Sequence, residues 1–159
     1  MSVAEGLDLS QHVINAVVAY VLRWGRPPRA VLAVSDDDLR LSLFDELRAR
    51  GFEVLEAAHA RPLHAALVHA LSWPATHGVD LFVADAALQG CSPLHAFGYA
   101  RTRGLTTPAI LLTEESDPQK TEADRLALDL CSRLHAMVAI DRTLLRVLRR
   151  RWSERPVAA

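Results

Sequence analysis

Hydrophobic residues follow two alternating rhythms along most of this chain. Short apolar runs bounded by turn residues, typical of buried strands, alternate with stretches in which apolar residues recur every three or four positions, as in amphipathic helices. Strands and helices that alternate in this order form a parallel sheet covered by helices on both faces. The pattern therefore predicts an α/β fold with five parallel strands, at residues 30–35, 52–56, 79–85, 109–113 and 136–140.

Caps and turn residues mark where the predicted helices begin and end. Ser92 and Ser116 are polar caps with a proline close behind, and a cluster of aspartates at Asp36–Asp38 begins another helix that ends at Gly51. The helices predicted after the first strand are residues 36–51, 62–71, 93–103, 116–134 and 143–152.

An additional amphipathic helix is predicted over residues 9–24, and a stiff linker, Gly25–Pro28, follows it. It is not needed to complete the strand–helix repeats, yet one of its faces is strongly apolar (Val13, Val17, Tyr20, Val21 and Trp24). Such a face must be covered. We expect a symmetric homodimer through this helix, with packing against the chain's own helices as the alternative.

This division gives three parts, namely an N-terminal helix and linker (1–28), an α/β domain (29–152) and a flexible tail (153–159).

Composition narrows the class of protein. With 159 residues, half of them hydrophobic, the chain is long enough for one well-packed domain. The formal net charge of −1 gives no overall attraction to nucleic acid or membrane. The longest apolar stretch, Val13–Leu22, is too short to span a bilayer, and the amino terminus lacks the basic start of a signal peptide. Cys91 and Cys131 have no paired spacing, so we expect reduced thiols in a cytoplasmic protein.

Small polar or acidic residues end three of the predicted strands: Asp36 and Asp37 after the first, Asp85 at the third and Thr113 at the fourth. Because the carboxyl ends of parallel strands line one crevice, these side chains should converge in one acidic pocket. Clustered carboxylates repel one another unless a cation lies among them, and Mg²⁺ prefers such oxygen ligands. Aspartates at a helix start also act as caps without any metal, so both roles stay open.

Motifs for other functions are missing. The chain contains no GxGxxG, P-loop or GxSxG sequence, and its histidines show no zinc-binding spacing. The run Arg149–Arg151 is typical of a solvated helix end, so we do not expect contact with nucleic acid. We therefore do not expect a free-standing enzyme.

Residues 30–150 resemble the receiver domain of two-component response regulators, a flavodoxin-like fold with strand order 2-1-3-4-5. The resemblance implies a signalling module that binds protein partners, a kinase or an output protein. Carried over by motif, Asp85 matches the phosphoacceptor, Thr113 the hydroxyl switch, and Asp36 and Asp37 the acidic pair that binds Mg²⁺ with Asp85. Ser35 with Asp36 is an equally good match for that pair.

The chain also departs from the receiver pattern. The predicted fifth strand has neither the family's lysine nor its switch aromatic, and Arg142 is the nearest basic residue. Glu114 follows Thr113, where the family has a small residue, and its charge would repel a phosphate. These losses indicate an atypical receiver or pseudo-receiver, phosphorylated poorly or not at all at Asp85.

A second resemblance concerns the segment Asp129–Thr143, which is similar in rhythm to the end of the receiver-like wing domain of ornithine, lysine and arginine decarboxylases. It implies the alternative that the chain is a regulatory domain of a larger pyridoxal-phosphate enzyme. No residue here matches a site for that cofactor.

Overall fold

Five parallel strands form the centre of the molecule. The computed structural model describes residues 3–72, 78–114 and 120–153. The strands are β1 (Arg29–Ala33), β2 (Glu53–Ala57), β3 (Leu81–Asp85), β4 (Ala109–Thr113) and β5 (Leu128–Ser132). They pair in the order β2-β1-β3-β4-β5, which confirms the predicted flavodoxin-like topology. The three central strands are apolar and buried on both faces, as strands covered by helices on each side must be.

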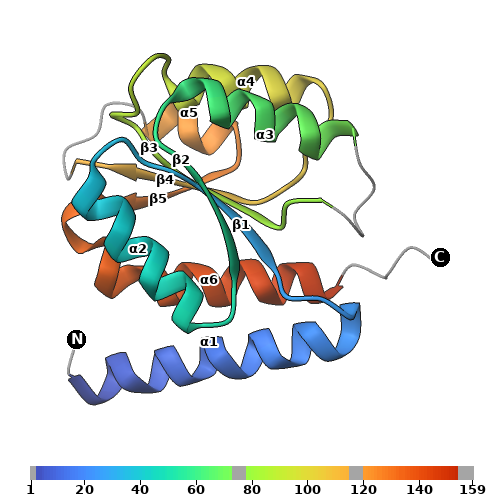
Figure 1. The fold of residues 1–159 in the computed structure, drawn as a ribbon, viewed down its shortest axis with the longest axis vertical. Coiled ribbons are helices and arrows are strands. Elements are labelled where there is room, and N and C mark those ends of the chain that lie inside the picture. The colour runs from blue at the N-terminus through green and yellow to red at the C-terminus, as the bar shows by residue number, and fades with distance from the viewer. Residues whose placement is uncertain (1–2, 73–77, 115–119, 154–159) are drawn as a thin grey trace.

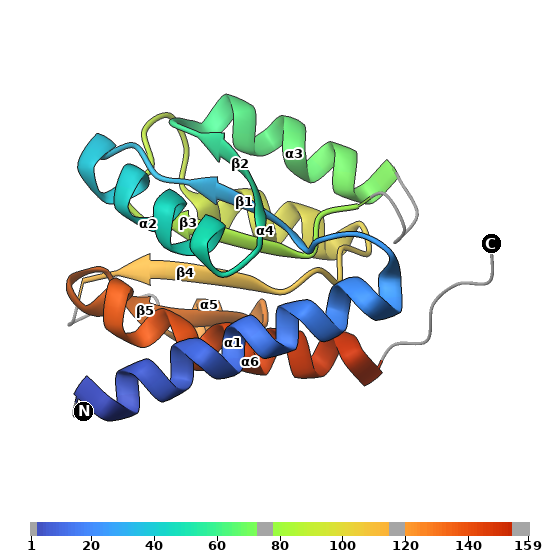
Figure 2. The same ribbon diagram turned by 60° about the horizontal axis from the view of Figure 1, so that its bottom comes forward.

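Helices cover the sheet in layers (Figure 1). Helices α2 (Asp37–Ala49) and α6 (Ala136–Ser153) pack on one face, and a short 3₁₀ turn, Arg133–His135, leads into α6. Helices α3 (Ala60–Ser72), α4 (Pro93–Thr102) and α5 (Lys120–Arg125) pack on the other. The remaining helix, α1 (Val3–Trp24), forms an outer layer against α6, on the side away from the sheet (Figures 1 and 2).

The fifth strand was predicted in the wrong place. Residues 136–140 form the first turns of α6, because the buried residues Ala136, Ile140 and Leu144 recur every four positions and continue a helical face. The true strand, β5, is partly polar, since Asp129 and Ser132 are half-exposed at the edge of the sheet.

The helix predicted over residues 116–134 is correspondingly shorter. Its described part is α5, Lys120–Arg125, and residues 116–119 lie outside the described residues. Ala127 then turns the chain into β5 with a φ of 54°, in the left-handed region.

Helix α1 buries its apolar face within its own molecule. Val13, Val17 and Tyr20 are buried among residues of α2 and α6 and the sheet, which corresponds to the intramolecular alternative. The helix also begins earlier than predicted, at Val3. A second copy is therefore not needed to cover this face. A homodimer through α1 stays a prediction, but the apolar face no longer supports it.

A buried carboxylate fixes the end of α1 and the linker. Asp80, next to β3, accepts hydrogen bonds from the Tyr20 hydroxyl (2.6 Å), the Arg26 guanidinium (2.8 Å) and the Arg29 amide (2.8 Å). These bonds connect three consecutive segments of the chain to the sheet, so α1 is an integral part of the domain.

Over the described residues, the helices are too short or too polar to cross a bilayer. Of the predicted tail, 153–159, residue Ser153 ends α6 and residues 154–159 lie outside the described residues.

Candidate functional site at the carboxyl edge of the sheet

The carboxyl ends of β3, β4 and β5 bring the predicted site residues to one edge of the sheet. Asp85 ends β3 and pairs in register with Leu112, and Thr113 ends β4 opposite Ser132 of β5. Both Asp85 and Thr113 are buried. The adjoining loop after β1 carries Asp36. The parallel topology therefore places these residues at the same edge of the sheet.

Arg133 is the residue that the sequence interpretation missed. It follows β5 directly, and its guanidinium binds the Asp85 carboxylate through two nitrogens. Nε lies 2.9 Å from Oδ2 and Nη2 lies 2.5 Å from Oδ1. The Ala87 amide donates a further hydrogen bond of 2.9 Å to Oδ1. Both oxygens of Asp85 are thus engaged by a cation of the chain itself, in the bidentate geometry that makes arginine–carboxylate pairs strong.

Other charges surround this pair. The hydrogen bonds to Asp85 raise the pKa of Arg133 above its ordinary value, and the neighbouring Glu114 and Asp36 act in the same direction. Glu114 is exposed, and its carboxylate lies 3.6 Å from Nη1 of Arg133. The positive charge at the site is therefore fixed, and carboxylates surround it.

The acidic pair after β1 separates in the structure. The Asp36 carboxylate accepts a hydrogen bond of 2.8 Å from the Leu39 amide and caps α2, as the capping interpretation allowed. Asp37 is exposed and pairs with Arg40 at 2.6 Å, and Arg40 also donates to the Val34 carbonyl. The hydroxyl of Ser35, the alternative partner of Asp36, donates to the Ala58 carbonyl.

These contacts do not fit a magnesium site. Mg²⁺ binds carboxylate oxygens that can turn toward it and keeps several waters. Here both oxygens of Asp85 face a guanidinium, Asp36 faces a helix terminus, and Asp37 is directed to Arg40. Among the residues that the structure describes, no cluster of three or more histidine, cysteine or carboxylate side chains is arranged to hold a metal ion.

The corrected position of β5 also changes the comparison with the receiver pattern. Arg142, named as the nearest basic residue, lies exposed on α6, whereas Arg133 stands directly after the strand. A basic residue is therefore present at the site. The strand Leu128–Ser132 contains no aromatic residue, so the missing switch aromatic remains a departure from the receiver pattern. The signal for Arg133 was available in the sequence, as a basic residue after a short alternating segment.

No family model matches the chain, and no curated protein matches it. Solved structures do. The receiver domain of the Francisella response regulator 1452 is 15% identical, with a TM-score of 0.67 over 78% of this chain and 98% of that one. The receiver domain of the TMAO respiratory system response regulator TorR is 20% identical, with a TM-score of 0.63 over 79% and 98%.

A third similar structure is the signal receiver domain of a signal transduction histidine kinase from Syntrophus aciditrophicus, which is 17% identical. Its TM-score is 0.64 over 83% of this chain and 98% of that one. In each case the match covers nearly the whole receiver domain. The chain therefore has the fold of response-regulator receiver domains, extended by helix α1 at its amino end.

Proposed function

We propose that the chain is a receiver-like signalling module that acts by binding other proteins and does so without phosphorylation of Asp85. The observation that supports this most directly is the bidentate pair of Arg133 and Asp85. A phosphoacceptor carboxylate needs a free oxygen to attack phosphorus and a cation beside it that offsets the charge of the donor. In this chain the cation, Arg133, is bound to both oxygens of the carboxylate that would have to attack, Asp85.

Glu114 adds to the barrier. Its exposed carboxylate lies beside Arg133 and would repel an incoming phosphate dianion. A phosphodonor must therefore separate the Arg133–Asp85 pair and approach Glu114 at the same time. Breaking a paired, partly buried charge costs a few kcal/mol, on the order of 3, which slows transfer by about a hundredfold.

Mass spectrometry after incubation with acetyl phosphate and Mg²⁺ tests the proposal. The unchanged chain should show no added phosphoryl group, and Arg133→Ala should become labelled slowly because it frees both oxygens of Asp85. In the Arg133→Ala background, a second change Asp85→Asn should abolish the labelling, and a second change Glu114→Ala should increase its rate. Arg125→Ala, which removes an exposed arginine paired with Glu122, is the matched control and should stay unlabelled. Rapid stoichiometric labelling of the unchanged chain would contradict the proposal.

The comparisons with solved structures give no support to the decarboxylase alternative. The segment Asp129–Thr143, which carries that resemblance, contains β5, a 3₁₀ turn and the start of α6. Asp141, which followed the supposed strand, is buried on α6 and pairs with Arg50. That residue therefore joins two helices of this domain.

The outer side of α1 is the surface through which two copies of the chain could associate. The inner face of this helix is covered, while Val18, Val21 and Leu22 are exposed on its outer side. Light scattering of the chain and of Leu22→Ser at high micromolar concentration measures whether this outer side contributes to a dimer.

A further inference from the structure

Helices α3 and α4 have an unusual charge composition. Over their full lengths, Ala60–Ser72 and Pro93–Thr102, they contain no aspartate or glutamate. Their charged and titratable side chains are Arg61, His64, His69, His95 and Arg101, and Arg103 caps α4. Helix α2, on the other face of the sheet, carries four carboxylates. Since the whole chain has a net charge of −1, this composition marks a local surface of basic character.

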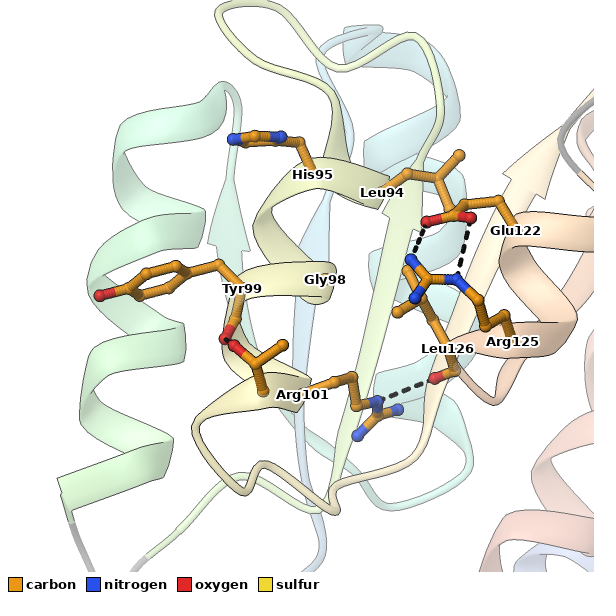
Figure 3. A pocket seen from close by; sticks show the side chains of 9 residues that line it. Leu94, His95, Gly98, Tyr99, Arg101, Glu122, Arg125 and Leu126 are labelled. Carbon is orange, nitrogen blue, oxygen red and sulfur yellow. Dashed lines mark hydrogen bonds and ion pairs between the residues drawn. The ribbon is translucent and has the colours of Figure 1, made fainter.

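An apolar groove runs between these two helices. Its volume is about 270 Å³, and its apolar lining includes Leu67, Val68 and Leu71 from α3 and Tyr99 from α4. Val68 is 62% exposed and Tyr99 is 60% exposed. Figure 3 shows the Tyr99 ring directed toward α3, and Tyr99 also lines the neighbouring depression between α4 and α5. Large apolar side chains that gather in this way on a surface mark binding sites more often than isolated ones do.

Two exposed arginines stand on the helices that form the groove, one after α4 and one at the start of α3. The Arg103 guanidinium lies 4.8 Å from the centre of the Tyr99 ring, which places a positive charge beside the exposed aromatic. Arg61 is exposed at the start of α3. Arg101, by contrast, lines the depression on the other side of α4 and donates to the carbonyls of Leu105, Thr107 and Leu126.

The depression on the other side of α4 is lined by two arginines, Arg101 and Arg125, and both are engaged within the chain. There Arg125 is paired with Glu122, at 2.5 Å (Figure 3). The α3–α4 groove is therefore distinguished by an arginine, Arg103, that lies against an exposed aromatic ring of its lining.

We propose that the α3–α4 face binds an acidic amphipathic helix of a partner protein, with apolar side chains in the groove and carboxylates against Arg61 and Arg103. An apolar groove between two helices accepts a helix through anchors at positions i, i+3, i+4 and i+7. Nucleic acid fits less well, because phosphate binding needs many cations and stacking aromatics, and Tyr99 is the one aromatic among the described residues that line the groove. The inference rests on the proposed function, since it names the surface through which the module would bind a partner. Helix α1 lies on the opposite side of the molecule and leaves this face uncovered (Figure 1).

Fluorescence anisotropy with a labelled synthetic peptide tests this surface. The probe is a helical peptide of about 16 residues with leucines at i, i+3, i+4 and i+7 and glutamates elsewhere. We expect saturable binding, and we expect Tyr99→Ser and Val68→Ser each to weaken it about tenfold, by removing apolar contact at the groove. The double variant Arg61→Glu, Arg103→Glu should weaken it similarly and favour a lysine version of the peptide. Leu41→Ser, which changes a residue 59% exposed on α2, is the matched control and should bind normally.

Several results would overturn the proposal: no binding of the acidic peptide at about 1 mM, equal binding of the lysine version or of a scrambled peptide, or unchanged binding by all groove variants. Tighter binding to anionic vesicles or to single-stranded DNA that the same variants abolish would also overturn it, in favour of those ligands. Val68 and Tyr99 are both exposed, so thermal melts should show that the variants at these positions are folded. These results are independent of Asp85 labelling, so failure of this inference and failure of the proposed function can be told apart.

Discussion

The Tyr20 hydroxyl donates a hydrogen bond of 2.6 Å to the buried carboxylate of Asp80, across sixty positions of the sequence. This bond joins the additional N-terminal helix to the start of the central strand of the sheet. Tyr20 is fully buried and stacks on Trp24, so both the ring and the hydroxyl serve the same contact.

Tyr20→Phe should lower the free energy of unfolding by about 2 kcal/mol, because the variant keeps the ring but leaves Asp80 with one donor fewer in a buried position. Urea denaturation followed by circular dichroism measures the change. Tyr99→Phe removes the same hydroxyl from an exposed ring and should change the stability by less than about 0.5 kcal/mol. Equal effects of the two variants would contradict the role given to Asp80.

Gly51→Ala should destabilise the chain more than Gly104→Ala. Both glycines have a positive φ, of +100° and +96°, so both variants carry a backbone cost of about 1 kcal/mol. A Cβ at Gly51 would in addition lie 2.8 Å from Cγ1 of Val17 on α1, whereas nothing lies within 4 Å at Gly104. We expect an extra loss of about 1–3 kcal/mol in the free energy of unfolding. Adding Val17→Ala to Gly51→Ala should recover part of the clash, and no recovery would argue against close packing of α1 there.

Arg133→Ala should create a magnesium-dependent gain in stability that the unchanged chain lacks. Without the guanidinium, Asp85 and the nearby Asp36 lose their cation and become suitable oxygen ligands. Thermal melts with and without about 10 mM MgCl₂ should shift by about 2–4 °C for Arg133→Ala and not for the unchanged chain or the Arg125→Ala control. A shift of the same size in the unchanged chain would show that the arginine leaves room for the metal.

The two thiols should differ in reactivity. Burial raises the pKa of the Cys131 thiol above its ordinary value, so less of the reactive thiolate is present at any pH below that pKa. Cys131 is 5% exposed on β5, whereas Cys91 is half-exposed after β3. Iodoacetamide at pH 8 should alkylate Cys91 at least about tenfold faster, as peptide mass spectrometry would show. Denaturing the chain should remove the difference, and equal rates in the folded chain would contradict the burial of Cys131.

The sequence by itself determined the class of fold and four of the five strands. Runs such as Ala109–Thr113 are short, apolar and bounded by turn residues, and each follows a predicted helix in the regular strand–helix alternation, which together favoured a buried strand. The placement of Asp85 and Thr113 at one edge followed as well, because parallel strands all end on the same side.

The tertiary structure alone decided the edge strand, the partner of Asp85 and the role of α1. Ala136–Ile140 is an apolar run of strand length, and only its packing in register with Leu144 and Leu148 makes it a helix. With residues 136–140 taken as the strand, Arg133 preceded the amino end of that strand, on the opposite side of the sheet from the site, and was not assigned to it. Likewise, the apolar face of a helix indicates that the face is buried, but it does not identify the surface that covers it, because the hydrophobic effect is not directional. The choice between a second copy and the chain's own α6 required the positions of both helices and of the Asp80 carboxylate that holds Tyr20.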